Sequence, residues 1–194
     1  MIKKSVQLVT LKKDNISDFA KERNSLLQKA KTDWVFFLDS DEEMTSVLNK
    51  EILAKIQNQK YNGFYIRRKN YFLGKFIGTD KILRLGRKGK GRWRRKVHEI
   101  WEIEGNAGEL DNPIIHNSYK DLHEAVAKIN LYSSLHAEAN MEEGKRSNLC
   151  KIIFYPPAKF IQSFLVGRGF VFSMLQSFHS FLGWAKLWQL QRKK

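Results

Sequence analysis

Trp34-Val35-Phe36-Phe37-Leu38-Asp39-Ser40-Asp41-Glu42-Glu43 is the stretch that decides the fold. Its first five residues are all apolar, which is typical of a strand buried on both faces of a sheet. Four carboxylates follow within the next five positions. Ligands of open α/β sheets bind beyond the carboxyl ends of the strands. The sequence therefore places Asp39 and Asp41 where a ligand would be bound.

Two interpretations of this carboxylate cluster remain open from the spacing alone. Asp39 and Asp41 lie two positions apart at the end of a strand, so both side chains can turn toward one cation. Hard divalent cations prefer oxygen ligands and can in turn hold a diphosphate. The same spacing also fits a strand end followed by a solvated acidic turn that caps the next helix.

The composition points to one globular domain, or to one domain with an appendage, and to a polyanionic partner. The chain has 194 residues and an apolar content of 42%, so wholesale disorder is excluded. Its formal net charge of +15 is unusually high. Such a charge indicates nucleic acid, an anionic membrane surface or a phosphorylated substrate.

The cysteine count and the hydropathy pattern exclude several other classes. A single cysteine, Cys150, rules out an internal disulfide and fits a reducing cytosol. No His or Cys cluster has the spacing of zinc ligands. The basic N-terminus has no continuous apolar run, so no signal peptide is expected. The stretch from Gly169 to Ala185 is the best candidate for a membrane span, but Gln176 and His179 interrupt it.

The first third of the chain alternates strands and helices. The pattern predicts strands at 6–10 and 34–38 and helices at 18–31 and 46–58. This order is typical of an α/β layer with parallel strands. The apolar residues expected to face inward from the second helix are Val47, Leu48, Ile52 and Ile56.

Beyond residue 61 the pattern changes to shorter strands and a basic run. Strands are expected at 64–67, 80–85, 97–101 and 113–116, with a turn at 71–74. The basic residues cluster around three glycines and are Arg84, Arg87, Lys88, Lys90, Arg92, Arg94, Arg95 and Lys96. They form either a solvated loop or a flexible loop that closes over phosphates or anionic lipid.

Three polar residues among apolar neighbours are candidates for catalysis or for a structural role. His98 and Glu99 lie within one predicted strand, and His116 ends another. Their spacing does not separate the two roles.

The C-terminal part is helical and aromatic. A long amphipathic helix is expected from 121 to 143, with Gly144 as the residue that ends it. Pro156-Pro157 is expected to interrupt the chain, and residues 158–190 are rich in Phe and Trp with basic residues at the edges. This stretch fits a helix lying in a membrane interface, or a helix packed on the core or at a dimer interface. The membrane is favoured because the aromatic residues exceed what one packing face needs.

The motifs, taken in order, resemble a known family. Phe19-Ala20-x-x-Arg23-Asn24 and Asp33-Trp34-Val35-x-x-Leu38-Asp39-x-Asp41-Glu42 resemble the inverting family 2 glycosyltransferases of the A-type fold. The later motifs resemble the lipopolysaccharide-core and cell-envelope branch: Arg68-x-Asn70-Tyr71-Phe72-x-Gly74, Asp80-Lys81-x-x-Arg84-Leu85, Lys88-Gly89-x-Gly91-x-Trp93, Val97-His98-Glu99 and His116-x-x-Tyr119. The segment from Gly167 to Trp188 is similar to the C-terminal membrane-associated segment of that branch.

The resemblance implies a nucleotide-sugar donor, a divalent metal (Mg or Mn) and a lipid-linked or lipopolysaccharide-type glycan acceptor. It implies an A-type sheet over residues 1–120 and a helical membrane-binding extension over 121–194. The expected place is the cytoplasmic face of the cell membrane. The residues implied for the donor are Arg23, Asn24, Asp39, Asp41 and Arg84; for the metal, Asp39, Asp41, His98 and His116; and for the base, Glu99, with Asp80 as second choice.

One departure from the family concerns the start of the chain. The family opens with a strand-helix-strand unit that carries part of the nucleotide site, and here residues 6–10 correspond to the strand after it. The chain is therefore expected to be a truncated or split member, to have a misassigned start, or to have lost independent activity. A partner chain is one source of the missing unit. A non-catalytic membrane-associated subunit stays open as an alternative. A nucleic-acid-binding module is weaker, because it leaves the four carboxylates unexplained and no nucleic-acid-binding motif is present.

Overall fold

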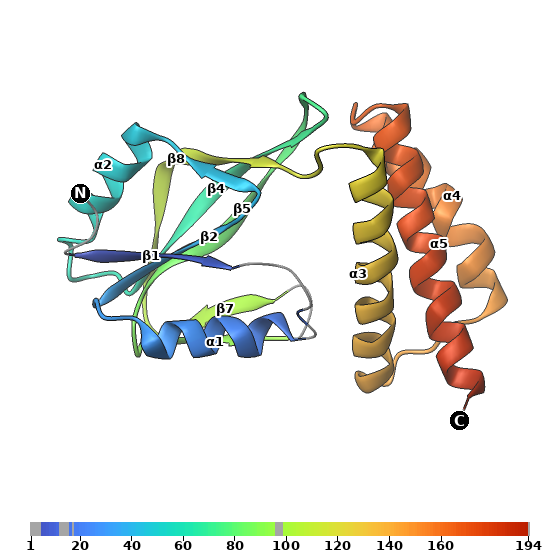
Figure 1. Cartoon of the computed structure of the whole chain (residues 1–194), viewed down its shortest axis with the longest axis horizontal. Helices are drawn as coiled ribbons and strands as arrows, with labels where there is room; N and C mark the ends of the chain where they lie inside the picture. The colour runs from blue at the N-terminus through green and yellow to red at the C-terminus, as the bar shows by residue number, and fades with distance from the viewer. Residues whose placement is uncertain (1–4, 12–15, 17, 96–98, 194) are drawn as a thin grey trace. The chain divides into compact units, whose positions relative to one another are not determined.

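The computed structural model describes residues 5–11, 16, 18–95 and 99–193 (Figure 1). The chain divides into two compact units, one of Met1–Tyr71 and Gly78–Asn117 and one of Phe72–Ile77 and Ser118–Lys194. The elements in chain order are β1 (Val6–Leu11), α1 (Phe19–Lys29), β2 (Trp34–Asp39), β3 (Glu42–Met44), α2 (Ser46–Lys55), β4 (Gly63–Phe72), β5 (Lys75–Arg87), β6 (Gly91–Arg94), β7 (Ile100–Ile103), β8 (Ala107–Asn117), α3 (Leu122–Glu142), α4 (Leu149–Leu165) and α5 (Phe170–Arg192).

The first unit is built on a mixed sheet with the strand order β1-β2-β5-β4-β8-β3. β1 and β2 are parallel, as are β4 and β8, but β2 pairs antiparallel with β5 and β3 antiparallel with β8. The parallel layer expected for the first third of the chain is thus confirmed by β1 and β2, and the later strands make the sheet mixed. The turn between β4 and β5 is the reason, because Leu73 and Gly74 both have positive φ, 46° and 78°, as in a tight hairpin.

β2 is buried on both faces, as its apolar run predicts. Trp34 and Phe36 belong to a core under α2, together with Leu48 and Ile52. Val35, on the alternate face, packs with α1, β6 and β7. Two layers therefore cover the sheet, α2 on one face and α1 with the two-stranded sheet β6-β7 on the other.

Side-chain caps begin both helices near the predicted positions. Asp18 accepts a hydrogen bond from the backbone N–H of Lys21, and Thr45 accepts one from that of Leu48. Both helices end two or three residues earlier than predicted. The expectation for Val47 is wrong, since it is 57% exposed and lies a third of a helical turn away from the buried Leu48.

The basic run is largely strand rather than loop. Residues 84–87 end β5, and 91–94 form β6, which was not predicted. β6 pairs antiparallel with β7, and Trp93 faces Trp101 across the pair. Both indole rings are buried and stack at 5.0 Å between centroids. The free energy gained by burying the two indole rings favours the strand pair, although the neighbouring glycines favour turns.

The second unit contains three helices and the tip of the β4-β5 hairpin. Phe72 and Ile77 of the tip pack in one cluster with Ala125 and Ile129 of α3 and with Phe172 of α5. α3 matches its predicted span and ends in a Schellman motif: Gly144 has φ +73°, its N–H donates to the Met141 carbonyl, and the Lys145 N–H donates to that of Asn140.

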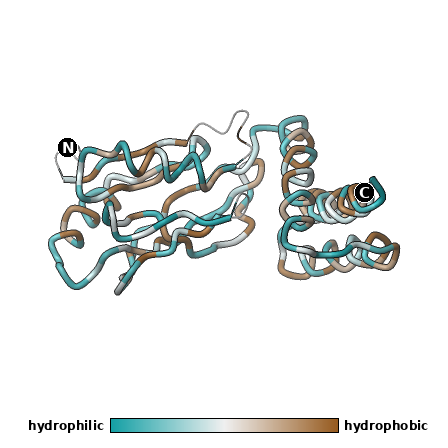
Figure 2. Tube along the Cα trace, turned by 90° about the horizontal axis from the view of Figure 1, so that it is seen from below, coloured by the Kyte–Doolittle hydropathy of each residue, from teal (hydrophilic) through white to brown (hydrophobic). Residues whose placement is uncertain are grey.

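The aromatic segment forms two helices rather than one. The break lies at Val166–Gly169, where Gly167 and Gly169 have positive φ. Pro156 and Pro157 do not interrupt the chain as expected, because they lie inside α4, where Pro156 is buried. Figure 2 shows hydrophobic stretches along these helices. Within the described residues, no helix combines the length and the apolarity needed to cross a bilayer.

Candidate active site

Four buried charged side chains converge where β2 ends. Asp39 of β2, Glu42 of β3, Arg84 of β5 and Arg23 of α1 are each at most 6% exposed. Asp39 Oδ1 accepts a hydrogen bond from Arg23 Nη2 at 2.7 Å, and its Oδ2 accepts one from Arg84 Nη2 at 3.0 Å. Both oxygens of Asp39 are thus held by guanidinium groups. Buried ions of this kind are tolerated only when they are paired in this way.

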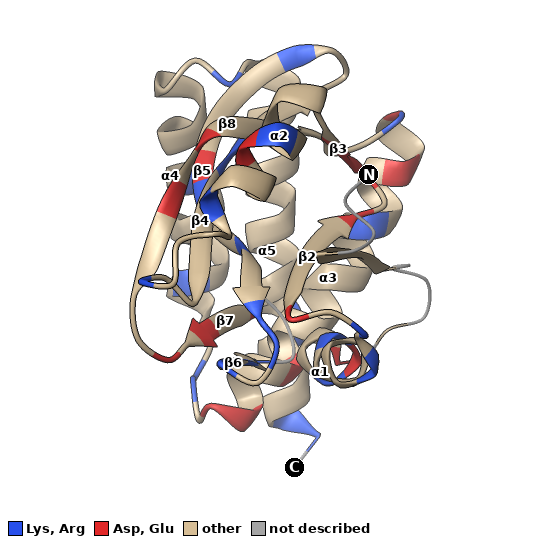
Figure 3. Ribbon diagram, turned by 90° about the vertical axis from the view of Figure 1, so that its left-hand side faces the viewer, with Lys and Arg blue, Asp and Glu red and all other residues tan. Residues whose placement is uncertain are grey.

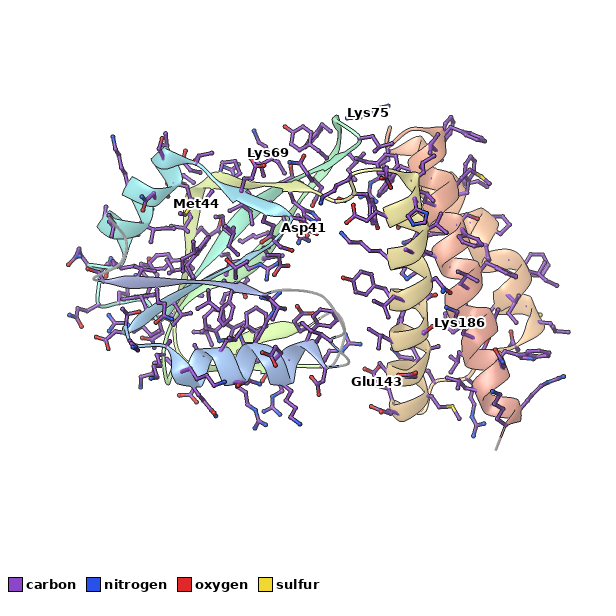
Figure 4. The ribbon with its side chains drawn as sticks, in the orientation of Figure 1. Asp41, Met44, Lys69, Lys75, Glu143 and Lys186 are labelled. Carbon is purple, nitrogen blue, oxygen red and sulfur yellow. The ribbon has the colours of Figure 1, made fainter. Side chains whose placement is uncertain are left out.

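Glu42 connects this cluster to a second one. Its Oε1 accepts hydrogen bonds from Arg84 Nη2 at 3.0 Å and from Arg68 Nη1 at 3.1 Å. Its Oε2 accepts one from the backbone N–H of Asp39 at 2.9 Å. The last bond closes the turn that carries Asp41 between β2 and β3 (Figure 4). Glu42 therefore fixes the conformation of that turn.

The second cluster lies on β4 and β5. Arg68 donates to Asp80 through Nε at 3.1 Å and Nη2 at 2.6 Å, and Asn70 Nδ2 donates to the same carboxylate at 2.9 Å. Burial alone would raise the pKa of Asp80, but the hydrogen bonds and charge of Arg68, together with Asn70, outweigh it and lower the pKa. Asp80 is thus held as a carboxylate. Figure 3 shows acidic and basic segments close together on β4, β5 and β8.

Asn70 also sets the tautomer of His116. Because Asn70 gives its amide N–H to Asp80, its carbonyl oxygen faces His116 Nδ1 at 2.7 Å. With Nδ1–H donating to Asn70, Nε2 is the ring nitrogen that faces Asp41 Oδ2 at 3.6 Å. A cation between Nε2 and the carboxylate, either a proton or a metal ion, would join the two side chains.

Arg23 is packed between rings and carboxylates. Its guanidinium lies 4.7 Å from the Trp93 ring centroid and 5.5 Å from that of Phe37, and its Nε donates to Glu99 at 3.0 Å. Burial alone would lower the pKa of Arg23, but Asp39 and Glu99 outweigh it and raise the pKa. The Nη1 atom of Arg23 is buried without a hydrogen-bond partner among the described residues.

Three of the four residues expected to bind metal are described by the structure, and they do not share one site. Asp41 and His116 lie together because β3 pairs with β8, with Glu42 opposite His116. Asp39 is instead engaged by two arginines. His98 lies outside the described residues. No group of three His, Cys, Asp or Glu side chains suited to a metal occurs in the part of the chain that the structure describes.

The residues expected to bind the donor also fall into two groups in the structure. Arg23 and Arg84 lie in the buried cluster with Asp39. Asn24 uses both polar groups of its side chain on the backbone of Trp93, at 2.9 Å each. Its contact in the structure is therefore to β6, which it ties to α1.

Glu42, Arg68 and Asn70 had no role assigned from the sequence. For Arg68 and Asn70, the sequence did offer one indication of a shared role, because they lie two positions apart on one strand and so share a face. Their common partner Asp80 lies on the other arm of the hairpin. Sequence spacing within one strand does not reveal this cross-strand contact.

Comparisons with known proteins show the family of the chain. The sequence profile described as glycosyl transferase family 2 matches residues 3–106. The chain is 30% identical, over 88% of its length, to the lipopolysaccharide core biosynthesis glycosyltransferase LpsC of Rhizobium meliloti (strain 1021). It is 25% identical over 83% of its length to the uncharacterized glycosyltransferase RT0209 of Rickettsia typhi, and 26% identical over 82% to an uncharacterized glycosyltransferase of Rickettsia bellii.

The chain spans 69%, 64% and 63% of the lengths of these three relatives. The matched residues 3–106 include both arms of the charged cluster, from Arg23 to Asp80 and Arg84. The resemblance inferred from the ordered motifs is thus confirmed at the level of the family and of its lipopolysaccharide-related relatives. The chain belongs to family 2 of the glycosyltransferases.

Proposed function

We propose that this chain transfers a sugar from a nucleotide-sugar donor to a lipid-linked or lipopolysaccharide-type glycan, with inversion at the anomeric carbon and with a divalent metal ion. Family membership supports a nucleotide-sugar donor and a glycan acceptor. The observation that carries the metal is the Asp41–His116 pair, whose Oδ2 and Nε2 atoms face each other at 3.6 Å.

Asp41 and His116 fit a hard or borderline cation, since they offer one carboxylate oxygen and one imidazole nitrogen. The outer contacts fit as well, because Asn70 orients the imidazole and Asp80 orients Asn70. A bound Mg²⁺ or Mn²⁺ would neutralise charge on the leaving diphosphate. Donor phosphates and water would complete its coordination.

Glu99 is the proposed base. In an inverting transfer the acceptor oxygen attacks the anomeric carbon, the bond to the diphosphate oxygen breaks, and the acceptor proton passes to a carboxylate. Glu99 is partly accessible, with a side chain 17% exposed, and among the described residues it accepts a hydrogen bond from Arg23. Asp80 is the weaker candidate, because three N–H groups occupy its oxygens and its pKa is lowered.

The metal assignment can be tested by Mn²⁺ binding in the presence of pyrophosphate, followed by electron paramagnetic resonance. Asp41→Asn and His116→Gln should each weaken Mn²⁺ binding about 10-fold or more. Asp111→Asn is the matched control, because its side chain is 79% exposed on the same strand as His116. Unchanged binding in both site variants would remove the metal from the proposal.

Attachment to the cytoplasmic face of the membrane is a second part of the proposal. Large apolar side chains of α4 are exposed, among them Phe154 at 67% and Leu165 at 78%. Exposed apolar patches of this kind mark interaction surfaces. Flotation with vesicles that contain phosphatidylglycerol tests this membrane attachment. The protein should float with the vesicles, and a protein that stays in the bottom fraction would contradict the attachment.

A partner chain that adds a strand-helix-strand unit belongs to the same proposal. β1 ends the strand order of the main sheet, and Leu8 on it is 43% exposed. Adding such a unit to the purified chain should tighten binding of nucleotide sugars and raise transfer. Equal activity with and without the added unit would contradict this part. A non-catalytic subunit is the remaining alternative, and full transfer activity would exclude it.

A further inference from the structure

The C-terminal segment of the chain is basic without any acidic residue. Residues 144–194 contain no Asp or Glu and nine basic residues: Lys145, Arg146, Lys151, Lys159, Arg168, Lys186, Arg192, Lys193 and Lys194. No carboxylate of this segment can therefore repel an anion. The segment that forms α4 and α5 therefore attracts anionic partners electrostatically.

A groove of about 500 Å³ lies between α4 and α5. Its lining residues are Tyr155, Ala158, Lys159 and Gln162 from α4, with Ser180 and Trp184 from α5. The α4 positions are spaced i, i+3, i+4 and i+7, and the α5 positions i and i+4, so each set shares one helical face. The groove belongs to the second unit alone and is separate from the charged cluster of the first.

The walls of the groove combine aromatic rings with nitrogen and oxygen donors. Tyr155 and Trp184 meet edge to face, with centroids 5.4 Å apart and an angle of 89° between the rings. Lys151 is not a lining residue, but its Nζ lies 4.7 Å from the ring centroid of Trp184, which lines the groove, and donates to the Arg146 carbonyl at 2.6 Å. Lys159 lies at the lining with Nζ 3.0 Å from Gln162 Oε1. Ammonium, amide and hydroxyl groups beside an indole suit a phosphate that carries a polyol.

The apolar surroundings favour a lipid over a small soluble anion. Ile161 and Leu165 extend the exposed face of α4 beside the groove and are 54% and 78% exposed. Phe154, next to Tyr155, is 67% exposed. A phosphate ion makes no use of such side chains, whereas a lipid brings acyl chains to them while its head group occupies the groove.

We propose that the groove between α4 and α5 binds the phosphodiester head group of an anionic glycerophospholipid in a membrane surface. Lys151 and Lys159 neutralise the phosphate, and Gln162, Ser180 and the Trp184 ring contact the glycerol. This site rests on the membrane attachment proposed above and makes it selective for the head group. It adds no role in sugar transfer.

The test uses the full chain in flotation with vesicles of phosphatidylcholine, with and without phosphatidylglycerol. The variant Lys151→Gln/Lys159→Gln should lower the affinity for the anionic vesicles by about fivefold per lysine. The variant Lys75→Gln/Arg168→Gln is the matched control. It removes the same charge from the same unit, but neither residue lines the groove, whereas Lys159 lines it and Lys151 contacts the Trp184 ring that lines it. Its affinity should fall clearly less, and thermal unfolding checks that both variants fold.

Equal loss in the two double variants would mean diffuse attraction only, and would overturn the site. Normal flotation of the groove variant would also overturn it, while leaving the membrane attachment intact. If the unaltered chain floats with neither vesicle, the attachment and the groove site fail together.

Soluble ligands separate the possible occupants. Dihexanoyl phosphatidylglycerol below its micellar concentration should compete with the vesicles, and the groove variant should lose this competition. Inorganic phosphate or glycerol phosphate that competes equally well would reassign the groove to small anions. A single-stranded RNA that binds the unaltered chain and is lost in the groove variant would reassign it to nucleic acid. Either result would overturn the lipid assignment.

Discussion

Glu42 is the residue on which the two charged clusters depend. Its side chain is fully buried and bonds to Arg84, Arg68 and the backbone of Asp39. Glu42→Gln removes the negative charge shared by the buried guanidinium of Arg84 and the partly buried guanidinium of Arg68. We expect it to lower the free energy of unfolding by about 3–5 kcal/mol, the cost of breaking a buried ion pair.

Urea unfolding measures this change. The matched control is Glu43→Gln, because Glu43 is the exposed neighbour on the same strand. Its effect should stay within about 0.5 kcal/mol. A similar loss in both variants would show that Glu42 does not hold the site together.

Asp80 makes the stability of the fold depend on pH. Because its pKa is lowered in the folded chain, Asp80 contributes stability that is fully present above the ordinary carboxyl pKa of about 3.9. That contribution to stability is lost as the pH falls through the lowered pKa that Asp80 has in the folded chain. Unfolding of the chain and of Asp80→Asn, followed from pH 7 to pH 2, should show the difference between them shrinking only below about pH 4. A constant difference would contradict the lowered pKa.

Glu99 and Asp80 can be separated as bases by their kinetics. Glu99→Gln should keep donor binding and lower the rate of transfer by about 100-fold or more. Asp80→Asn should act through His116 and Asn70 instead, and so weaken metal binding. A normal rate in Glu99→Gln, with the loss in Asp80→Asn, would move the role to Asp80.

At the scale of elements, the two-stranded sheet β6-β7 is held against the main sheet by close packing. A Cβ added at Gly86 of β5 would meet the ring of Trp101 at 2.7 Å. Trp101 is 3% exposed and stacks on Trp93, which supports Arg23. The site therefore depends on a glycine that contacts none of its charged groups.

Gly86→Ala should destabilise the chain by about 1–3 kcal/mol, because the buried ring must move. Gly183→Ala is the control, since nothing lies within 4 Å of a Cβ at that helical position. It should be neutral or stabilising by up to about 1 kcal/mol. Thermal unfolding followed by circular dichroism compares the two, and a neutral Gly86→Ala would mean that β7 adjusts without cost.

At the scale of the whole molecule, the proposed membrane attachment would draw on both the net charge of +15 and the exposed apolar residues of α4. Electrostatic attraction to anionic vesicles should fall with added salt, whereas burial of apolar side chains should remain. We therefore expect vesicle binding to decrease to a plateau, not to zero, as NaCl is raised. Nucleic-acid binding would instead keep falling steeply.

Phe154→Ser/Leu165→Ser should remove the plateau, because these exposed side chains would supply the contact that is independent of salt. Sedimentation with sucrose-loaded vesicles at increasing NaCl measures it. A plateau that persists in this variant would place the apolar contact elsewhere in the chain.

The sequence by itself determined the features that depend on near neighbours. The apolar run of β2, the starts of α1 and α2 and the glycine after α3 all lie where their patterns predict. The ordered motifs also identified the family, and the position of Asp39 and Asp41 at a strand end predicted the region of the candidate site. These signals extend over a few residues, which is the range of helix periodicity, strand alternation and capping.

Only the tertiary structure decided which charged residues meet. Asp39 is held by Arg23 and Arg84, which lie 16 and 45 positions away in the sequence. Asp41 follows Asp39 by two residues but faces His116 instead. His116 reaches Asp41 because β8 pairs with β3, and that pairing brings together residues far apart in the chain. The same holds for β6, which exists because Trp93 and Trp101 bury each other. Charge pairing and burial depend on distances in space, and one-dimensional spacing does not contain those distances.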